Sequence, residues 1–272
     1  MGRKSLLSMI NSATKPEKDY AEEFFNAFTK HIEKENTKER HPSFNITPSG
    51  LKCLRAIVYR LSGVKTDGFT PSYSLCGITE SGSNRHEVNQ GYIDSMETCN
   101  FIDVGKYVKE HKLPLEVGEK KDFESPYETH LYDRKNHISF LVDGIIEFSG
   151  KTFILEIKTM VQTKFWKNKD DVPDEYKLQA TCYSLLLGIP QVMFLFEDRN
   201  ILTKKCLVYT PTEEEKNNMR DLIASCNDYV NKKIVPAKPV VDRKVCSYCD
   251  YKKTCSKSVK AYSSEEDEKY SE

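Results

Sequence analysis

The sequence lacks any long hydrophobic run. No stretch of its 272 residues approaches the roughly 20 apolar residues that a membrane helix needs. The N-terminal segment has a short apolar patch at residues 6–10, and no small-residue cleavage site follows it, so we expect no signal peptide. A Gly-x-x-x-x-Gly-Lys-Ser/Thr motif is also missing, which excludes a P-loop ATPase. The sequence therefore predicts a cytoplasmic protein without a P-loop ATPase site of its own.

An excess of charge of either sign is absent as well, because 41 basic residues balance 41 acidic residues. The balance hides a local asymmetry. Residues 238–260 hold seven Lys or Arg and two Asp, whereas residues 261–272 hold five acids and one Lys. A basic patch of this kind fits a polyanionic partner, but a solvated surface followed by a disordered tail fits the pattern equally well.

Cysteine occurs nine times, and an odd number in a cytoplasmic chain argues against a disulfide framework. Three cysteines, Cys246, Cys249 and Cys255, form a C-x2-C-x5-C motif, and Cys53 is the candidate fourth ligand. Four thiolates suit either zinc or a [4Fe–4S] cluster, although a zinc ribbon would normally offer a second close pair. Five scattered cysteines are expected to be mainly buried structural thiols: Cys76, Cys99, Cys182, Cys206 and Cys226.

Hydrophobic patterning predicts a mixed α/β fold, in which helices precede and follow a mixed central sheet. Thr14 to Glu17 has capping-box spacing, and an aromatic and aliphatic stripe then recurs every fourth residue from Tyr20 to Ile32. Further helices are expected at about 48–61, 77–96, 174–187 and 212–231. Extended segments are expected at about 114–120, 138–148, 151–159, 191–196 and 203–209, with a polar loop at 161–173.

The clearest local signal is a β-hairpin, in which a two-residue turn at 149–150 pairs Phe148 with Lys151. The same register places Asp143 directly opposite Glu156, with Cβ atoms about 5 Å apart. Facing carboxylates repel each other, and a divalent cation such as Mg²⁺ or Mn²⁺ between them relieves the repulsion. Lys158 shares a strand face with Glu156 and could orient a metal-bound water or stabilise a charged transition state. The alternative is that these charges simply face solvent.

An Asp followed after a dozen residues by Glu-x-Lys on a hairpin resembles the core of the PD-(D/E)XK nuclease superfamily, with Val142 in place of the usual Pro. The resemblance implies a restriction-endonuclease-like fold with a mixed central sheet. It also implies that Asp143 and Glu156 bind a divalent metal and act in catalysis together with Lys158.

Two further motifs resemble the RecB-type branch of that superfamily. Gly82-x-x-x-His86 matches its helical metal ligand, and Gln179-x-x-x-Tyr183 matches the helix that follows the hairpin. The resemblance implies that His86 joins Asp143 and Glu156 as a metal ligand, and that Gln179 and Tyr183 belong to the catalytic set. Taken singly, these side chains are ordinary helix residues.

The placing of one cysteine before this core and three after it resembles the iron–sulfur subgroup of RecB-type nucleases. That subgroup includes the CRISPR-adaptation nucleases and the B subunit of AddAB. The resemblance implies a structural [4Fe–4S] cluster on Cys53, Cys246, Cys249 and Cys255, with zinc as the alternative occupant. It also implies three regions, namely a helical extension at 1–45, the nuclease domain at 46–257 and an acidic tail at 258–272.

These observations together predict a single-strand DNA exonuclease that processes DNA ends in recombination, repair or phage DNA metabolism. The expected partners are DNA and a separate helicase or recombination protein. Two alternatives stay open, a DNA-end-binding adaptor with a degenerate site and an endonuclease or nickase. Candidate DNA contacts combine basic side chains with one aromatic side chain: Arg55, Arg85, Lys164, Trp166 and Lys167.

Overall fold

The structure is a computed structural model that describes residues 19–37, 44–119, 125–238 and 243–262. The chain divides into two units, and each is described by itself. The described part of the smaller unit comprises residues 19–37 and 69–78, and that of the larger unit comprises 44–68 and the residues from 79 onward. Helix α4 (Tyr73–Asp94) begins in the smaller unit and continues into the larger one.

The smaller unit contains helix α2 (Tyr20–Glu35), which carries the predicted apolar stripe. The side chain of Asp19 caps the helix by accepting hydrogen bonds from two backbone N–H groups. The capping signal expected at 14–17 lies outside the described residues. Much of the stripe is exposed, although Phe24 stacks on Phe28 and the ring of Phe25 meets that of Tyr73 edge-on.

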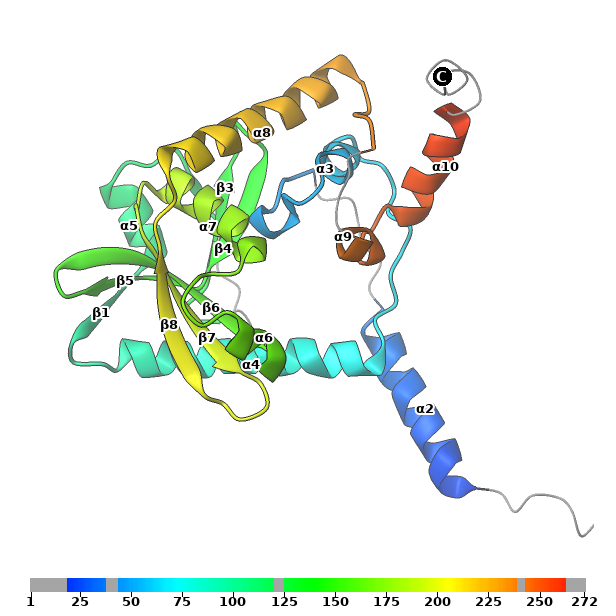
Figure 1. Cartoon of the computed structure of the whole chain (residues 1–272), viewed down its shortest axis with the longest axis horizontal. Helices are drawn as coiled ribbons and strands as arrows, with labels where there is room; N and C mark the ends of the chain where they lie inside the picture. Colours follow the sequence, from blue (N-terminus) through cyan, green and yellow to red (C-terminus); the bar gives the residue numbers. More distant parts are fainter. Residues whose placement is uncertain (1–18, 38–43, 120–124, 239–242, 263–272) are drawn as a thin grey trace, which may run out of the picture. The chain divides into compact units, whose positions relative to one another are not determined.

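The larger unit contains two sheets, which confirms the mixed α/β architecture (Figure 1). The five-stranded sheet has the order β1 (Cys99–Ile102), β5 (Gly144–Phe148), β6 (Lys151–Met160), β7 (Val192–Asp198) and β8 (Lys204–Tyr209). Strands β6 and β7 are parallel, and the other neighbours are antiparallel. The second sheet is antiparallel and contains β2 (Glu116–Val117), β3 (Thr129–Asp133) and β4 (Ile138–Val142).

The hairpin register predicted from the turn is confirmed. Phe148 pairs with Lys151, and the ladder continues to the pair of Gly144 and Leu155. The expected single strand at 138–148 is wrong, because the chain bends at Asp143 and passes from one sheet to the other. Gly144 directly follows the bend, and its lack of a side chain leaves room for the ring of Phe101, which a Cβ atom there would meet.

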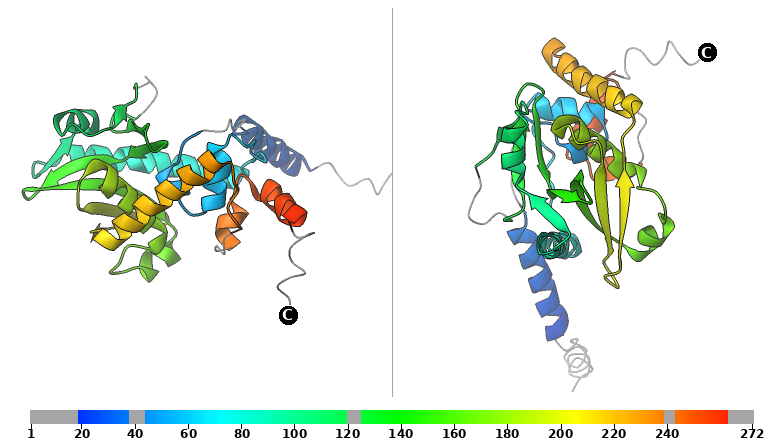
Figure 2. Two further views of the ribbon diagram at one scale, coloured as in Figure 1. Left: turned by 90° about the horizontal axis from the view of Figure 1, so that it is seen from above. Right: turned by 90° about the vertical axis from the view of Figure 1, so that its left-hand side faces the viewer.

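Three of the predicted helices are confirmed. They are α4, α7 (Asp174–Leu187) and α8 (Glu213–Lys232). Thr212 and Glu215 form a capping box at the start of α8, and Gly188 ends α7 in the left-handed conformation at φ +69°. Helix α8 packs against α7 and α3 (Leu54–Leu61), as Figure 1 and the view from above in Figure 2 show.

Other segments differ from the expectation. The helix expected at 48–61 is interrupted, because the 3₁₀ turn η1 (Pro48–Gly50) and α3 flank an extended Cys53. The loop expected at 161–173 contains a short helix, α6 (Gln162–Lys167). Three helices were not expected: α5 (Val104–Glu110), α9 (Arg243–Ser247) and α10 (Lys252–Tyr262). None of the helices in the described part of the chain is long and apolar enough to cross a membrane.

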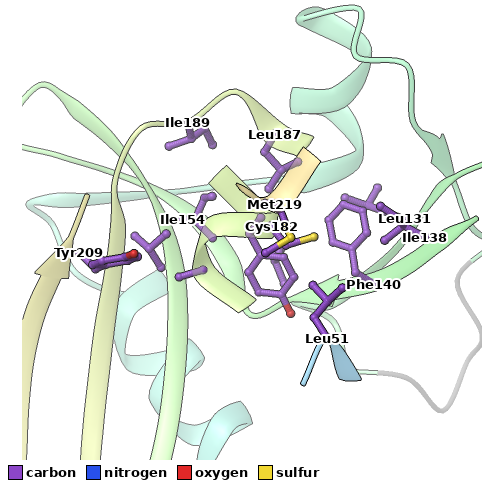
Figure 3. Close-up of a cluster of buried hydrophobic side chains, with 14 of the residues drawn as sticks. Leu51, Leu131, Ile138, Phe140, Ile154, Cys182, Leu187, Ile189, Tyr209 and Met219 are labelled. Atoms are coloured by element: carbon purple, nitrogen blue, oxygen red, sulfur yellow. The ribbon is translucent and has the colours of Figure 1, made fainter. Parts of the chain in front are cut away.

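The main core lies between the two sheets and the helices α3, α5, α7 and α8. Figure 3 shows Phe140 of the small sheet beside Leu131 and Ile138, next to Cys182 and Leu187 of α7. A smaller cluster on the opposite face of β6 contains Phe153, Leu155 and Ile157. Both faces of β6 are therefore buried at its centre, so Glu156 lies inside the protein and Lys158 is partly buried.

Candidate metal and catalytic site

Asp143 lies at the bend between the two sheets, and three contacts from two elements, α4 and β6, hold it there. One carboxylate oxygen, Oδ2, accepts a hydrogen bond of 2.6 Å from the backbone N–H of Ile157. The other, Oδ1, lies 3.2 Å from Nδ1 of His86 on α4. One turn later on that helix, the side-chain amide of Gln90 donates a 2.6 Å hydrogen bond to the backbone carbonyl of Asp143. The structure therefore brings His86 and Asp143 together.

Glu156 and Lys158 form an ion pair on β6, where the carboxylate is only 3% exposed. Burial raises the pKa of Glu156 to about 7, and the charge of Asp143 adds to this, although Lys158 opposes it. Burial lowers the pKa of Lys158, but the two neighbouring carboxylates outweigh this and raise it above its ordinary value. Lys158 thus stays protonated, and its one positive charge lies near two carboxylates, those of Glu156 and Asp143.

The imidazole of His86 lies near the same three charged groups, namely Asp143, Glu156 and Lys158. Burial lowers the pKa of its imidazole, but the hydrogen bond and the charge of Asp143 outweigh burial and raise the pKa above its ordinary value. Among the described residues, one group of three or more potential ligands has all its donor atoms within 4.8 Å of one another, namely His86, Glu128 and Asp143. Imidazole and carboxylate donors in one place suit a divalent cation such as Mn²⁺.

Glu128 was missed by the sequence analysis. It directly precedes β3, a strand that the hydrophobic pattern did not indicate, and it lies in no recognisable motif. The signal that could have found it is its place just before a hairpin whose second strand, β4, ends at Val142, one residue before Asp143. Glu156, which was expected to be a metal ligand, lies outside the 4.8 Å group, and its carboxylate is paired with Lys158.

Gln179 and Tyr183 lie together on α7 and reach the end of β4. The amide of Gln179 donates a 2.7 Å hydrogen bond to the hydroxyl of Tyr183, which donates one of 2.7 Å to the carbonyl of Leu141, two residues before Asp143. Burial raises the pKa of Tyr183 well above its ordinary value, and the charge of Glu156 adds to this. The hydroxyl therefore stays protonated and joins the helix to the bend at Asp143.

The candidate DNA contacts fall into two groups. Arg55 is buried, and its guanidinium donates to the carbonyl of Pro236 and to the hydroxyl of Tyr59. Arg85 makes a two-point ion pair with Glu197, with N–O distances of 2.5 and 2.9 Å. Three candidates on α6 are instead on the surface: Lys164, Trp166 and Lys167. Lys164 forms an ion pair with Glu175.

The four cysteines of the predicted cluster are partly buried free thiols: Cys53, Cys246, Cys249 and Cys255. Cys53 begins α3, Cys246 lies in α9 and Cys255 lies in α10. Burial raises the pKa of the Cys249 thiol, and the nearby thiols of Cys53 and Cys246 add to this. The fold therefore brings Cys53 close to the C-terminal cysteines. Of the scattered cysteines, Cys206 is exposed, which differs from the expectation of burial.

Hydrogen bonds join the same two segments. The backbone N–H of Asp67 donates to the carbonyl of Asp250 at 2.7 Å, and its carboxylate accepts a 2.7 Å hydrogen bond from the hydroxyl of Thr254. The ring of Tyr59 on α3 lies 5.6 Å from that of Tyr251, measured between centroids. The segment after Cys53 and the Cys-rich end are thus held together by polar and aromatic contacts as well.

Comparison with known proteins gives only distant likenesses. No protein-family model matches the chain, and no curated protein matches it in sequence. Among solved structures, SSO0001 is 13% identical with a TM-score of 0.41, over 85% of this chain and 96% of that one. An alkaline exonuclease, LHK-Exo from Laribacter hongkongensis, is 10% identical with a TM-score of 0.43, over 75% and 94%. The same exonuclease in complex with dAMP is 12% identical with a TM-score of 0.43, over 71% and 90%.

Proposed function

We propose that this protein is a divalent-metal-dependent deoxyribonuclease of the RecB type within the PD-(D/E)XK superfamily. The observation that carries the proposal is the set of buried Glu156 and partly buried Asp143 and Lys158 beside His86. A buried cluster with two carboxylates is costly unless its charge is matched, and functional sites are where such costs are retained. The donor set fits Mg²⁺ or Mn²⁺, held by His86, Asp143 and Glu156.

Each residue of the site then has a defined task. A bound cation would lower the pKa of a water molecule and balance the charge of the attacked phosphate. The N–H of Ile157 fixes the orientation of the Asp143 carboxylate. Lys158, held protonated by Glu156, would donate to the phosphate oxygen on which charge develops. Gln179 would position the strand or the attacking water by donating a hydrogen bond, and Tyr183 would hold the amide of Gln179 in place.

For DNA binding we retain the surface residues of α6, Lys164, Trp166 and Lys167, which directly follow the strand that carries Glu156. Lysine side chains contact phosphates, and an exposed indole offers a base a stacking surface. Arg55 and Arg85 are left out of this set, because their guanidinium groups are engaged inside the protein. The intact site disfavours the adaptor alternative.

We further propose that Cys53, Cys246, Cys249 and Cys255 hold a [4Fe–4S] cluster that staples the two ends of the domain at 46–257. The C-x2-C-x5-C spacing of the last three cysteines and the nearness of the Cys53 and Cys246 thiols to Cys249 support this proposal. Zinc on the same four thiolates is the alternative.

A cleavage assay tests the proposed activity. Protein prepared anaerobically is incubated with Mn²⁺ or Mg²⁺ and with end-labelled linear or circular DNA, each single-stranded or double-stranded. We expect metal-dependent release of label from linear single strands, with circles left intact. Cleavage of circles would favour the endonuclease alternative, whereas binding of linear DNA without cleavage under any of these conditions would favour the adaptor.

A further inference from the structure

Glu128 connects the small sheet to the candidate metal site. It precedes β3, and its carboxylate lies in the group with His86 and Asp143 whose donor atoms are within 4.8 Å of one another. The three residues come from a helix, the bend between the sheets and the small sheet. Three donors at this separation, from elements with separate backbone anchors, match the arrangement that a single cation requires.

Gln90 provides a second observation at the same place. Its side chain is fully buried, and its amide nitrogen donates to the backbone carbonyl of Asp143. That hydrogen bond fixes which end of the amide is oxygen. The oxygen, Oε1, is buried and has no hydrogen-bond partner within the part of the chain that the structure describes. A buried carbonyl oxygen without a donor is unfavourable, and a cation or a water bound to one would satisfy it.

A surface cavity adjoins Glu128. The cavity measures about 370 Å³, and its lining includes Glu128, Thr129 and His130 as well as Lys106 and Glu110 of α5. Glu128 therefore has one side toward the other two donors and one side toward a space of the size that small ligands occupy. Of the three donors, Glu128 is the one that lines this cavity.

We propose that Glu128 is a ligand of the divalent cation and that the small sheet is therefore part of the metal site. The inference deepens the proposed nuclease function and rests on the same site. It assigns a ligand that lies outside the Asp, Glu-x-Lys and His motifs. Glu156 is paired with Lys158, and its carboxylate would be the third one available to a cation held by Glu128 and Asp143.

The test measures Mn²⁺ binding without DNA, so it does not depend on cleavage. The full chain is titrated with Mn²⁺, and free Mn²⁺ is followed by its electron paramagnetic resonance signal. We expect Glu128→Gln to weaken binding at least about tenfold, because even residues outside the ligand shell change metal affinity about 10–100-fold. The matched control is Glu110→Gln, which removes an acid from the same cavity outside the 4.8 Å group and should bind Mn²⁺ like the wild type.

Wild-type affinity in Glu128→Gln would overturn the inference, as would equal weakening in both variants, which would indicate general electrostatics. The melting temperature of each metal-free variant is measured in parallel. If Glu128→Gln has a lower melting temperature than the wild type, a second variant is used. Glu128→Asp keeps the charge on a shorter side chain, and wild-type Mn²⁺ affinity in this variant would again overturn the inference. The two proposals can fail separately. If the wild-type protein cleaves no DNA but Glu128→Gln still loses Mn²⁺ binding, the nuclease function is refuted and the assignment of Glu128 as a metal ligand stands.

Discussion

Glu156 is almost fully enclosed by the protein, with an exposed fraction of 2% for the residue. Its partner Lys158 also lies near Asp143, so the metal-free site holds two carboxylates and one ammonium group. A cation bound between the carboxylates would supply the missing positive charge. At the residue scale, the site is therefore arranged for a ligand of positive charge.

The raised pKa of Glu156, about 7, predicts that Mn²⁺ affinity depends on pH. Below this pKa a proton must leave before the carboxylate binds metal, and the raised pKa of His86 acts in the same direction. Affinity should rise about tenfold per pH unit or more between pH 5 and 7 and level off above. Mn²⁺ titrations at several pH values measure this, and a flat profile across that range would refute it.

The raised pKa of Glu156 also predicts how the stability of the metal-free protein changes with pH. A carboxyl group whose pKa is raised in the folded state contributes stability that is fully present below its unfolded value and is lost as pH rises through about 7. The metal-free protein should therefore lose stability between about pH 4.5 and 7, and added Mn²⁺ should restore it at pH 7.5. Thermal melts with and without Mn²⁺ at each pH separate this contribution from others.

Gln179→Ala should lower cleavage strongly and leave Mn²⁺ affinity within about twofold of the wild type. Glutamine is a good hydrogen-bond donor to a phosphate or a water, and losing a positioning contact lowers turnover. Gln191→Ala, which removes a glutamine bonded to Thr210 at an exposed site, is the control. A large loss of Mn²⁺ affinity in Gln179→Ala would instead make this residue a structural partner of the metal ligands.

The sequence predicted the register from Phe148 and Lys151 to Gly144 and Leu155, because a two-residue turn fixes the pairs that follow it. The ladder ends there, one pair before the expected pair of Asp143 and Glu156. It could not predict Glu128, because that residue lies in no motif and directly precedes β3, a short strand without a clear hydrophobic period. The internal roles of Arg55 and Arg85 were missed for a different reason. Their partners, Pro236 and Glu197, are more than a hundred residues away in sequence.

At the scale of the element, α4 is fixed to two strands by two neighbouring rows of side chains. His86 and Gln90 bind Asp143, while Arg85 and Asn89 bind Glu197 at the end of β7. The contacts of Arg85 and Asn89 with Glu197 therefore hold α4 in the position from which His86 and Gln90 reach Asp143. Glu197 is therefore a positioning residue for His86.

Glu197→Gln should destabilise the protein by about 3 kcal/mol at pH 7. Burial raises the pKa of Glu197, but hydrogen bonds from Arg85, Asn89 and Lys204 outweigh it and lower the pKa to about 2. The stability contributed by such a group is present above its unfolded pKa and is lost as pH falls toward 2. Urea denaturation should therefore separate variant and wild type at pH 7 and bring them together near pH 2.5.

The matched control is Glu147→Gln, an exposed glutamate on β5, which should unfold like the wild type at both pH values. Mn²⁺ affinity is measured on the same samples. A loss of affinity in Glu197→Gln at pH 7, while the protein is still folded, identifies the positioning role, whereas unchanged affinity would reduce Glu197 to a stabilising residue.

The elements that the sequence predicted are those with strong local signals, such as α8 with its capping box and α7 with its terminal glycine. The break at Cys53 and the bend at Asp143 were not visible, because both depend on packing between distant segments. Strands β1 and β3 are short and carry mixed polar and apolar residues, so they have no clear period.

At the scale of the whole molecule, the segment after Cys53 and the C-terminal segment are joined through Asp67, Thr254 and the two tyrosine rings. Cys53→Ala should lose iron and melt at a lower temperature, because a site that ties distant segments contributes folding free energy. The control is Cys206→Ser, an exposed thiol outside the motif, which should keep both. Iron, sulfide and zinc analysis of anaerobic protein measures this, and one equivalent of zinc without iron would contradict the cluster.

The most direct measurement is cleavage of end-labelled single-stranded DNA by Glu156→Ala, in Mn²⁺, beside the wild type and Glu147→Ala. Both glutamates lie on the same hairpin, but only Glu156 is buried next to Lys158. We predict that Glu156→Ala loses cleavage by at least about a hundredfold while DNA binding persists. Glu147→Ala should cleave like the wild type. Wild-type cleavage by Glu156→Ala would contradict the assignment of this site as the catalytic centre.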